Sequence, residues 1–81
     1  MRVNAILPDW VLTPLIEGIF ASAEDPEKMR WGVTERQLLG RLGKPEDIGY
    51  AALFLATDES SFVSGSPLFA DGGLTAQLEV W

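Results

Sequence analysis

The sequence predicts an α/β fold in which a crossover helix joins two short parallel strands, and this unit is incomplete as a domain. Two short apolar runs, residues 2–7 and 67–70, are each followed by turn residues, as buried strands commonly are. Between them, residues 45–57 have the apolar spacing of a helix. A helix-bearing connection favours a parallel pair with a right-handed crossover. Because two strands make only a marginal sheet, either the rest of a longer chain or a partner chain must supply its neighbours.

The first strand, residues 2–7, ends at Pro8 and Asp9. Its mostly apolar sequence is typical of a strand that is buried on both faces. Ligands of open parallel sheets bind beyond the carboxyl ends of the strands. We therefore expect the loop of residues 8–14 to carry the function.

A short amphipathic helix is predicted over residues 15–23, where apolar residues recur at helical spacing after Pro14. The polar residues 24–28 include a proline and indicate either a loop or the start of another helix. Residues 29–33 follow no clear pattern, and their structure is left open. Residues 40–44, which contain two glycines, indicate a connector.

The helix over residues 45–57 has the clearest start in the chain. Pro45 suits the first helical position, and the two acidic residues after it complement the positive end of the helix dipole. The strand of residues 67–70 also begins with a proline, which cannot donate to a sheet ladder. That proline must therefore be the first residue of the strand or restrict the strand to an edge. Residues 74–81 are too short and mixed to assign.

Length and composition limit what the chain can do. Its 81 residues allow one domain at most, so we treat residues 1–81 as a single partial domain. A net charge of −6 argues against nucleic acid and anionic membranes as partners. The chain has no Cys and no His, which excludes disulfides and removes the commonest metal ligand and the commonest general base. We expect no metal and no membrane span, and a cytoplasmic location.

Several blocks of residues, taken together with their order and spacing, resemble the C-terminal part of the short-chain dehydrogenase/reductase family. The resemblance covers about residues 2–73. Any single block would be weak, whereas the whole series is highly specific. The blocks are Arg-Val-Asn-Ala-Ile at 2–6, Pro8 with Thr13 and Pro14, Arg-x-Gly-x-Pro-Glu-Asp-Ile at 41–48, Ala-Ala-Leu-Phe-Leu-Ala at 51–56, Ser-Ser-Phe-Val-x-Gly-Ser at 60–66 and Asp-Gly-Gly at 71–73.

The resemblance implies the C-terminal portion of a Rossmann-type doubly wound parallel sheet that binds NAD or NADP, in an oxidoreductase acting on carbonyl and alcohol groups. It implies that Pro8 and Asp9 line the nicotinamide end of the cofactor site. Val11 would offer its backbone to the carboxamide, and Thr13 would reach the carboxamide or the pyrophosphate with its hydroxyl. From spacing alone, the same loop is more often simple turn chemistry.

Asp9 departs from the family pattern, which usually has glycine after that proline. Glycine permits a positive φ there, and aspartate tolerates one better than most residues but adds a side chain and a charge. The carboxylate would favour an oxidised nicotinamide, or its bulk would narrow the pocket. The alternative is a turn residue without a functional role.

The reactive parts of the family's site are missing from these residues. No glycine-rich phosphate-binding turn occurs, and no Tyr-x-x-x-Lys, because the only tyrosine, Tyr50, is followed four positions later by Phe54. Lys28 and Lys44 lie in polar stretches and indicate solvated charges. We expect no catalytic residue in this chain and no carbonyl reduction by the chain alone.

Two other functions fit the same residues. One is a non-catalytic oligomerisation or interaction module, forming a homo-oligomer or binding a complementary chain through the helix of residues 45–57 and the last strand. The other is a nicotinamide-nucleotide binder without catalysis. The sequence decides neither the substrate nor NAD against NADP. The candidate interface residues are Phe54, Phe62, Phe69 and Trp81, and the residues that form either a substrate wall or simply a core are Trp10, Leu15, Ile19, Phe20, Met29 and Trp31.

Overall fold

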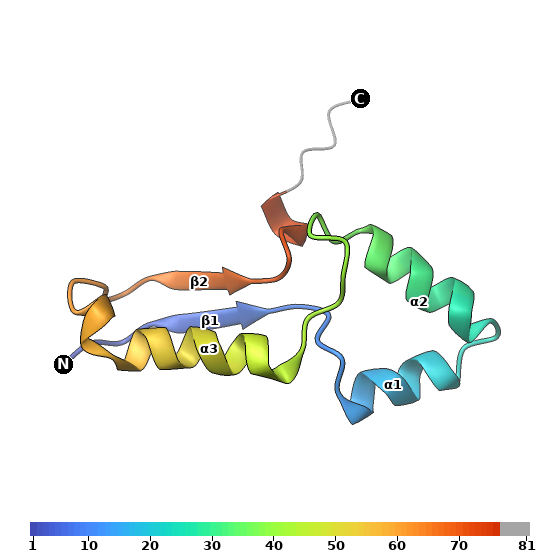
Figure 1. Cartoon of the computed structure of the whole chain (residues 1–81), viewed down its shortest axis with the longest axis horizontal. Helices are drawn as coiled ribbons and strands as arrows, with labels where there is room; N and C mark the ends of the chain where they lie inside the picture. The colour runs from blue at the N-terminus through green and yellow to red at the C-terminus, as the bar shows by residue number, and fades with distance from the viewer. Residues whose placement is uncertain (77–81) are drawn as a thin grey trace.

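The computed structural model describes residues 1–76 and contains two strands and three α-helices in that range (Figure 1). Short 3-10 turns, η1 and η2, follow α3 and β2. In chain order the elements are β1 (Ala5–Pro8), α1 (Pro14–Ala21), α2 (Pro26–Glu35), α3 (Pro45–Ala56), η1 (Asp58–Ser60), β2 (Pro67–Ala70) and η2 (Leu74–Ala76).

The two strands pair in parallel and α3 lies in the connection between them, which confirms the predicted α/β unit. The register runs from Ala5 opposite Pro67 to Pro8 opposite Ala70. Pro67 is the first residue of β2, one of the two placements that the sequence allowed. Helix α3 ends one residue earlier than predicted, with Thr57 as its C-cap.

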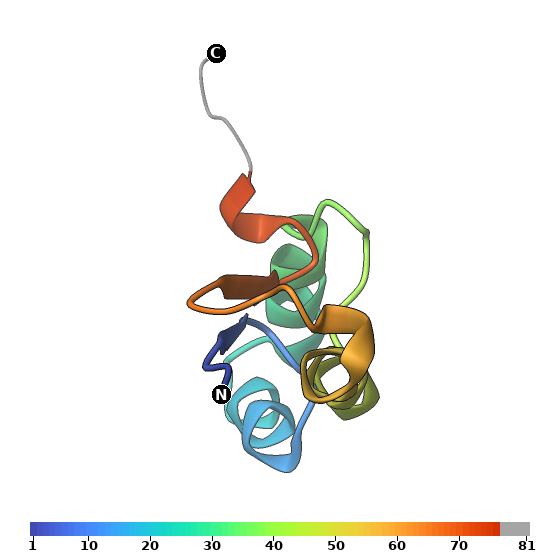
Figure 2. The same ribbon diagram turned by 90° about the vertical axis from the view of Figure 1, so that its left-hand side faces the viewer.

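Only one face of the sheet is covered by the described residues. Figure 2, which looks along the strands, shows α3 beside one face and no helix against the other. Ile6 and its partner Leu68 are half-buried, whereas Leu7 and its partner Phe69 are 36% and 53% exposed. The expectation that the first strand is buried on both faces is therefore wrong for the part of the chain that the structure describes, because no element within residues 1–76 covers the second face.

The first strand also begins later than predicted, at Ala5 and not at residue 2. Residues 2–4 are extended but bond to the loop before β2. The Val3 C=O accepts from the Gly65 N–H (2.6 Å), and the Asn4 side chain both donates to the Val63 C=O (3.1 Å) and accepts from the Ser66 N–H (3.0 Å). One backbone bond and the Asn4 side chain thus hold this segment in place of a regular strand ladder.

Arg2 ties the same segment to the end of α3. One guanidinium nitrogen, Nη2, donates to the C=O groups of Leu55 (2.9 Å) and Thr57 (3.3 Å). The other, Nη1, donates to Ser60 Oγ (3.1 Å) and to the Val63 C=O (3.2 Å). The last C=O groups of a helix have no partner within the helix, so a cation at this end satisfies them and favours the helix dipole.

Helices α1 and α2 form a hairpin beyond the carboxyl ends of the strands (Figure 1). Thr13 caps α1, which begins one residue before and ends two residues before the predicted span of 15–23. Helix α2 occupies the segment that the sequence left open. Its start carries an ordinary signal, an Asp25 side chain that caps the helix and a proline at the first position, but its apolar residues form only a narrow face.

The buried hydrophobic core lies at this hairpin and away from the sheet. Phe20, Val33 and Leu42 are the buried apolar residues, and Trp10 stacks on Phe20 with its ring centre 5.9 Å away. The radius of gyration of 15.1 Å exceeds the value of about 12 Å expected for a compact domain of this length. No helix in residues 1–76 is long and apolar enough to cross a membrane.

Candidate functional site

The loop of residues 9–13, which we call the β1–α1 loop, leads from the carboxyl end of β1 to the cap of α1. It forms a single parallel bridge, between Val11 and Gly43. The Gly43 N–H donates to the Trp10 C=O (2.9 Å), and the Leu12 N–H donates to the Gly43 C=O (2.8 Å). The bridge fixes this loop against the connector that precedes α3.

The bridge leaves the backbone of Val11 unpaired. In a parallel bridge of this kind, the residues on either side of Val11 make the bonds, so its own N–H and C=O point away from Gly43. Neither group bonds to any of the residues 1–76. Val11 thus presents one donor and one acceptor side by side on the open side of the loop.

Gly43 allows this close approach. A Cβ at position 43 would lie 3.3 Å from Val11 Cγ2 and 3.5 Å from the Trp10 C=O oxygen. The 3.3 Å contact would require the Val11 side chain to give by a few tenths of an ångström, whereas the 3.5 Å contact is ordinary. Gly43, in the predicted connector, therefore lets the connector approach the β1–α1 loop closely.

Thr13 is half-buried, and its Oγ1 accepts a bond from the Ile16 N–H (3.4 Å). Its C=O accepts from the Glu17 N–H (2.8 Å). A hydroxyl has one hydrogen to donate and two lone pairs. Because the cap uses only a lone pair, the hydroxyl hydrogen of Thr13 remains available to a ligand.

Pro8 and Asp9 are both exposed. Asp9 does not have a positive φ, so the tolerance of aspartate for that conformation, which the sequence reasoning invoked, is not needed here. The Asp9 carboxylate makes no hydrogen bond or ion pair within residues 1–76. Its charge at this edge of the sheet is therefore uncompensated by a direct partner.

A second turn lies beside the loop, because Asp71 follows Ala70, the partner of Pro8 in the sheet. The buried Asp71 carboxylate accepts bonds from the Thr75 hydroxyl, the Thr75 N–H (3.2 Å) and the Gly73 N–H (3.0 Å). The Thr75 hydroxyl bond is the main reason that the pKa of Asp71 is lowered. In the sequence, Asp71 stood out only as a turn residue after the second strand and as part of the Asp-Gly-Gly block, not as a hydrogen-bond acceptor for Thr75.

Asp47, in the first turn of α3, binds the connector of residues 40–44 through hydrogen bonds and an ion pair. Its two oxygens accept from Arg41 Nη1 (2.8 Å) and Nη2 (3.2 Å), and Oδ2 also accepts from the Lys44 N–H (2.8 Å). These bonds, the Arg41 side chain first, lower the pKa of Asp47 to about 2. The sequence predicted Asp47 to interact with the helix dipole but missed the ion pair, which joins residues on two different elements.

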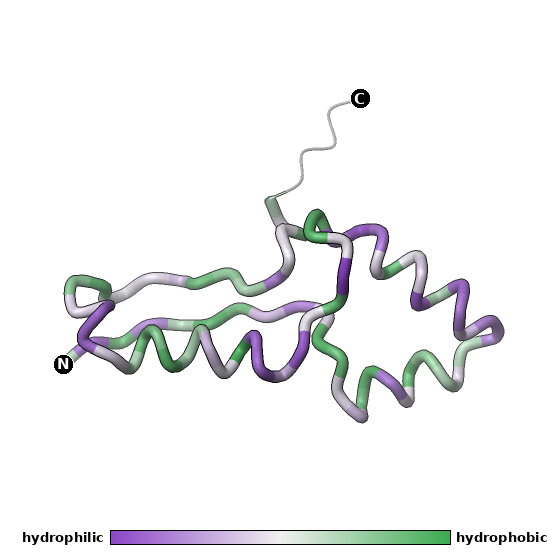
Figure 3. The backbone as a smooth tube through the Cα atoms, viewed as in Figure 1, coloured by the Kyte–Doolittle hydropathy of each residue, from purple (hydrophilic) through white to green (hydrophobic). Residues whose placement is uncertain are grey.

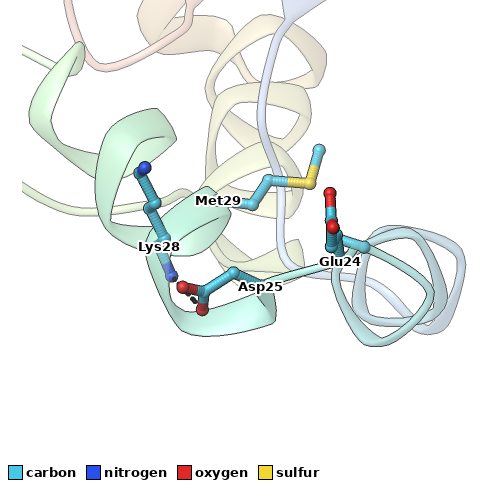
Figure 4. A pocket seen from close by; sticks show the side chains of 5 residues that line it. Glu24, Asp25, Lys28 and Met29 are labelled. Atoms are coloured by element: carbon cyan, nitrogen blue, oxygen red, sulfur yellow. Dashed lines mark hydrogen bonds between the residues drawn. The ribbon is translucent and has the colours of Figure 1, made fainter.

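Tyr50 and Lys28 lie on helices and not in the β1–α1 loop. Tyr50 is 69% exposed on α3. Figure 4 shows a hollow at the turn between α1 and α2, where the Lys28 N–H bonds to Asp25 Oδ1 (3.2 Å) to begin α2. None of the four predicted site residues lines that hollow. Within residues 1–76, no three His, Cys, Asp or Glu side chains are placed to hold a metal ion.

The six residues predicted to form a substrate wall or a core separate into two groups. Phe20 is buried in the core, and Trp10 and Met29 pack against it. Leu15 and Trp31 are 73% and 66% exposed, and Ile19 is 39% exposed. The core interpretation holds for the first three residues, and the last three remain on the surface of the hairpin.

Comparison with known proteins gives a consistent match along the chain. The family model described as enoyl-(acyl carrier protein) reductase matches residues 1–75. A 3-oxoacyl-[acyl-carrier-protein] reductase from Thermotoga maritima is 46% identical over 91% of this chain and 28% of the relative. An L-rhamnose-1-dehydrogenase from Scheffersomyces stipitis is 44% identical over 98% of this chain and 29% of the relative.

Solved structures give the same result. The ligand-free aldohexose dehydrogenase of Thermoplasma acidophilum matches 99% of this chain and 33% of its own chain, with a TM-score of 0.86 and 32% identity. A C-terminal deletion mutant of that dehydrogenase matches 94% of this chain and 35% of its own, with a TM-score of 0.78 and 33% identity. The chain thus spans less than a third of the length of the curated relatives described here.

Proposed function

Since this chain belongs to the short-chain dehydrogenase/reductase family, we propose that it is the C-terminal segment of an NAD(P)-dependent oxidoreductase acting on carbonyl and alcohol groups. In this proposal the segment holds the nicotinamide end of the cofactor. The observation that carries it is the free N–H and C=O pair of Val11 at the carboxyl end of β1. The cytoplasmic location stays a prediction from the sequence.

The two aldohexose dehydrogenase structures support a C-terminal position. The C-terminal deletion mutant of that enzyme matches 94% of this chain with a TM-score of 0.78, against 99% and 0.86 for the ligand-free enzyme, and a smaller match is what a C-terminal position would give. The apolar, uncovered face of the sheet, which includes Leu7 and Phe69, also favours a larger sheet with further neighbours.

The Val11 backbone fits a primary amide. A nicotinamide carboxamide has a C=O that accepts and an NH₂ that donates, so it can pair with the N–H and C=O of one residue without a charge. Thr13 would donate its hydroxyl hydrogen to the carboxamide or to the pyrophosphate. Pro8 and Asp9 would line the ring. The bound cofactor supplies the hydride chemistry.

This segment would position the cofactor but not complete a reaction. Carbonyl reduction needs a proton donor beside the substrate, and the Tyr-x-x-x-Lys pair that would serve does not occur in the 81 residues. We therefore propose that the chain alone is inactive.

Titration of the ¹⁵N-labelled chain with NAD⁺, followed by NMR, tests the site. We expect the Val11 amide resonance to shift. Thr13→Val should weaken binding by about three- to tenfold because it removes one hydrogen bond, whereas Thr13→Ser keeps the hydroxyl and the cap and should bind as the wild type does. A Val11 resonance that stays unmoved while other resonances shift would place the cofactor elsewhere and contradict the proposal.

The same sample tests the proposed inactivity. Addition of NADH or NADPH with a panel of ketones should give no oxidation of the cofactor above a control without protein. Turnover above that control would show that the chain carries a proton donor after all.

A second function, the oligomerisation module, is favoured by one observation. Apolar side chains are exposed along α3, in the loop before β2 and on β2 itself, and Figure 3 shows hydrophobic segments in these places. Association with a second copy or with a complementary chain would cover them. The predicted contact Trp81 lies outside the described residues. The side chains concerned are Tyr50 (69% exposed), Leu53 (59%), Phe54 (41%), Phe62 (103%) and Phe69 (53%).

Mass measurement in solution separates this function from a monomer. We expect a dimer or larger species, and we expect Leu53→Asp on α3 to shift it toward the monomer. Leu15→Asp on α1 is the matched control, because Leu15 is also exposed, at 73%, but lies outside the proposed interface. A wild-type monomer at all concentrations would rule out the homo-oligomer.

A further inference from the structure

We propose that the Asp9 carboxylate makes this site prefer the oxidised, cationic form of the nicotinamide to the reduced form. This inference rests on the proposed function, since it concerns the same cofactor. It goes beyond that function by giving the site a preferred redox state. The argument uses the position of Asp9, the absence of a direct partner for its charge, and the chemistry of the two cofactor forms.

Asp9 lies inside the proposed nicotinamide site. It separates Pro8 from the loop bridge, and two peptide units limit the distance between the Cα atoms of Asp9 and Val11 to about 7 Å. A carboxamide held by the Val11 backbone would therefore place the attached ring beside the same short loop that carries Asp9. The Asp9 charge would then lie on the same side of the sheet edge as the bound ring, at the carboxyl end of β1.

The Asp9 charge is not used elsewhere. The two other carboxylates near this edge of the sheet are satisfied, Asp71 by Thr75 and Gly73, and Asp47 by Arg41. Asp9 has no such partner within residues 1–76.

Lys44 follows Gly43 of the loop bridge and forms no ion pair with Asp9. Its exposed side chain extends from the connector and not from the β1–α1 loop. The unpaired Asp9 carboxylate therefore acts electrostatically on a ligand that is bound beside the loop.

The two cofactor forms differ at the ring by one elementary charge. NAD⁺ carries a positive nicotinamide and NADH a neutral dihydronicotinamide, while the phosphates and riboses are the same. A fixed negative charge beside the ring therefore stabilises bound NAD⁺ relative to bound NADH. For a partly solvated pair at this separation, Coulomb attraction corresponds to a preference of about three- to tenfold.

Dissociation constants of NAD⁺ and NADH, measured by NMR titration for three forms of the whole chain, test this inference. Asp9→Asn keeps the size of the side chain and removes the charge. Glu59→Gln removes one exposed charge in η1, at the other end of the sheet, and serves as the control. We expect Asp9→Asn to lower the ratio of the NADH constant to the NAD⁺ constant by about three- to tenfold, and Glu59→Gln to leave it unchanged.

Salt provides a second readout, because a Coulomb preference shrinks as ionic strength rises and a steric one does not. If both cofactor forms bind and their ratio is the same in the wild type and in Asp9→Asn, the inference is overturned and the proposed function stands. If neither form binds, the proposed function fails, and the preference fails with it.

Discussion

Replacement of Arg2 by alanine should lower the free energy of unfolding by about 2–3 kcal/mol, one of the two largest effects expected for this chain. The guanidinium donates to four oxygens at the end of α3 and in the loop before β2. Its loss leaves the C=O groups of Leu55 and Thr57 without this partner and releases residues 2–4. Urea denaturation followed by circular dichroism measures the change.

Two further variants make this experiment specific. Arg2→Lys keeps the charge but cannot reproduce a planar fork with two nitrogens, so it should recover only part of the loss. Arg30→Ala, at an exposed position of α2, removes an equal charge and should change the stability little. An Arg2→Ala chain as stable as the Arg30→Ala chain would show that the bonds seen here contribute nothing net.

Substitution of Gly73 by alanine should cost about 2–4 kcal/mol, for two separate reasons. Gly73 has a φ of 87°, where a side chain is strained. A Cβ there would also lie 2.9 Å from the Cβ of Leu38, so that backbone must shift. The turn after β2 and the loop that follows α2 would separate. This separation should raise hydrogen exchange at Leu39, whose N–H bonds to the Gly72 C=O (3.1 Å).

Gly65→Ala provides the matched control for the contact with Leu38. Gly65 has a similar φ of 72° but no atom within 4 Å of a built Cβ. It should therefore show the conformational cost alone, about 1–2 kcal/mol. Equal losses in the two variants would mean that the Leu38 contact relaxes at no cost.

Much of the fold could be predicted because its signals are local. The span 67–70 for β2 matches the structure, and α3 begins at Pro45 as expected, since a proline and two acidic residues mark a helix start without help from distant residues. Helix α2 has a capping Asp25 and a proline as well, yet its apolar face is too narrow to predict. Only the tertiary structure shows that α2 packs against α1.

The candidate site was only partly predictable. The resemblance indicated the four residues from Pro8 to Thr13, and the loop does follow the carboxyl end of β1. No local pattern could show that Val11 pairs with Gly43 across more than thirty residues, leaving its own N–H and C=O free. Nor could it show that Asp71 and Asp47 find partners while Asp9 does not.

By itself, the sequence determined that this chain is a strand, a crossover helix and a second strand of the short-chain dehydrogenase/reductase type, because those features depend on neighbouring residues and on motif order. The tertiary structure alone decided which polar groups are engaged and which are free, and which face of the sheet stays uncovered. Those outcomes depend on contacts between residues far apart in the chain, as between Arg2 and Val63, and a one-dimensional pattern does not specify such contacts.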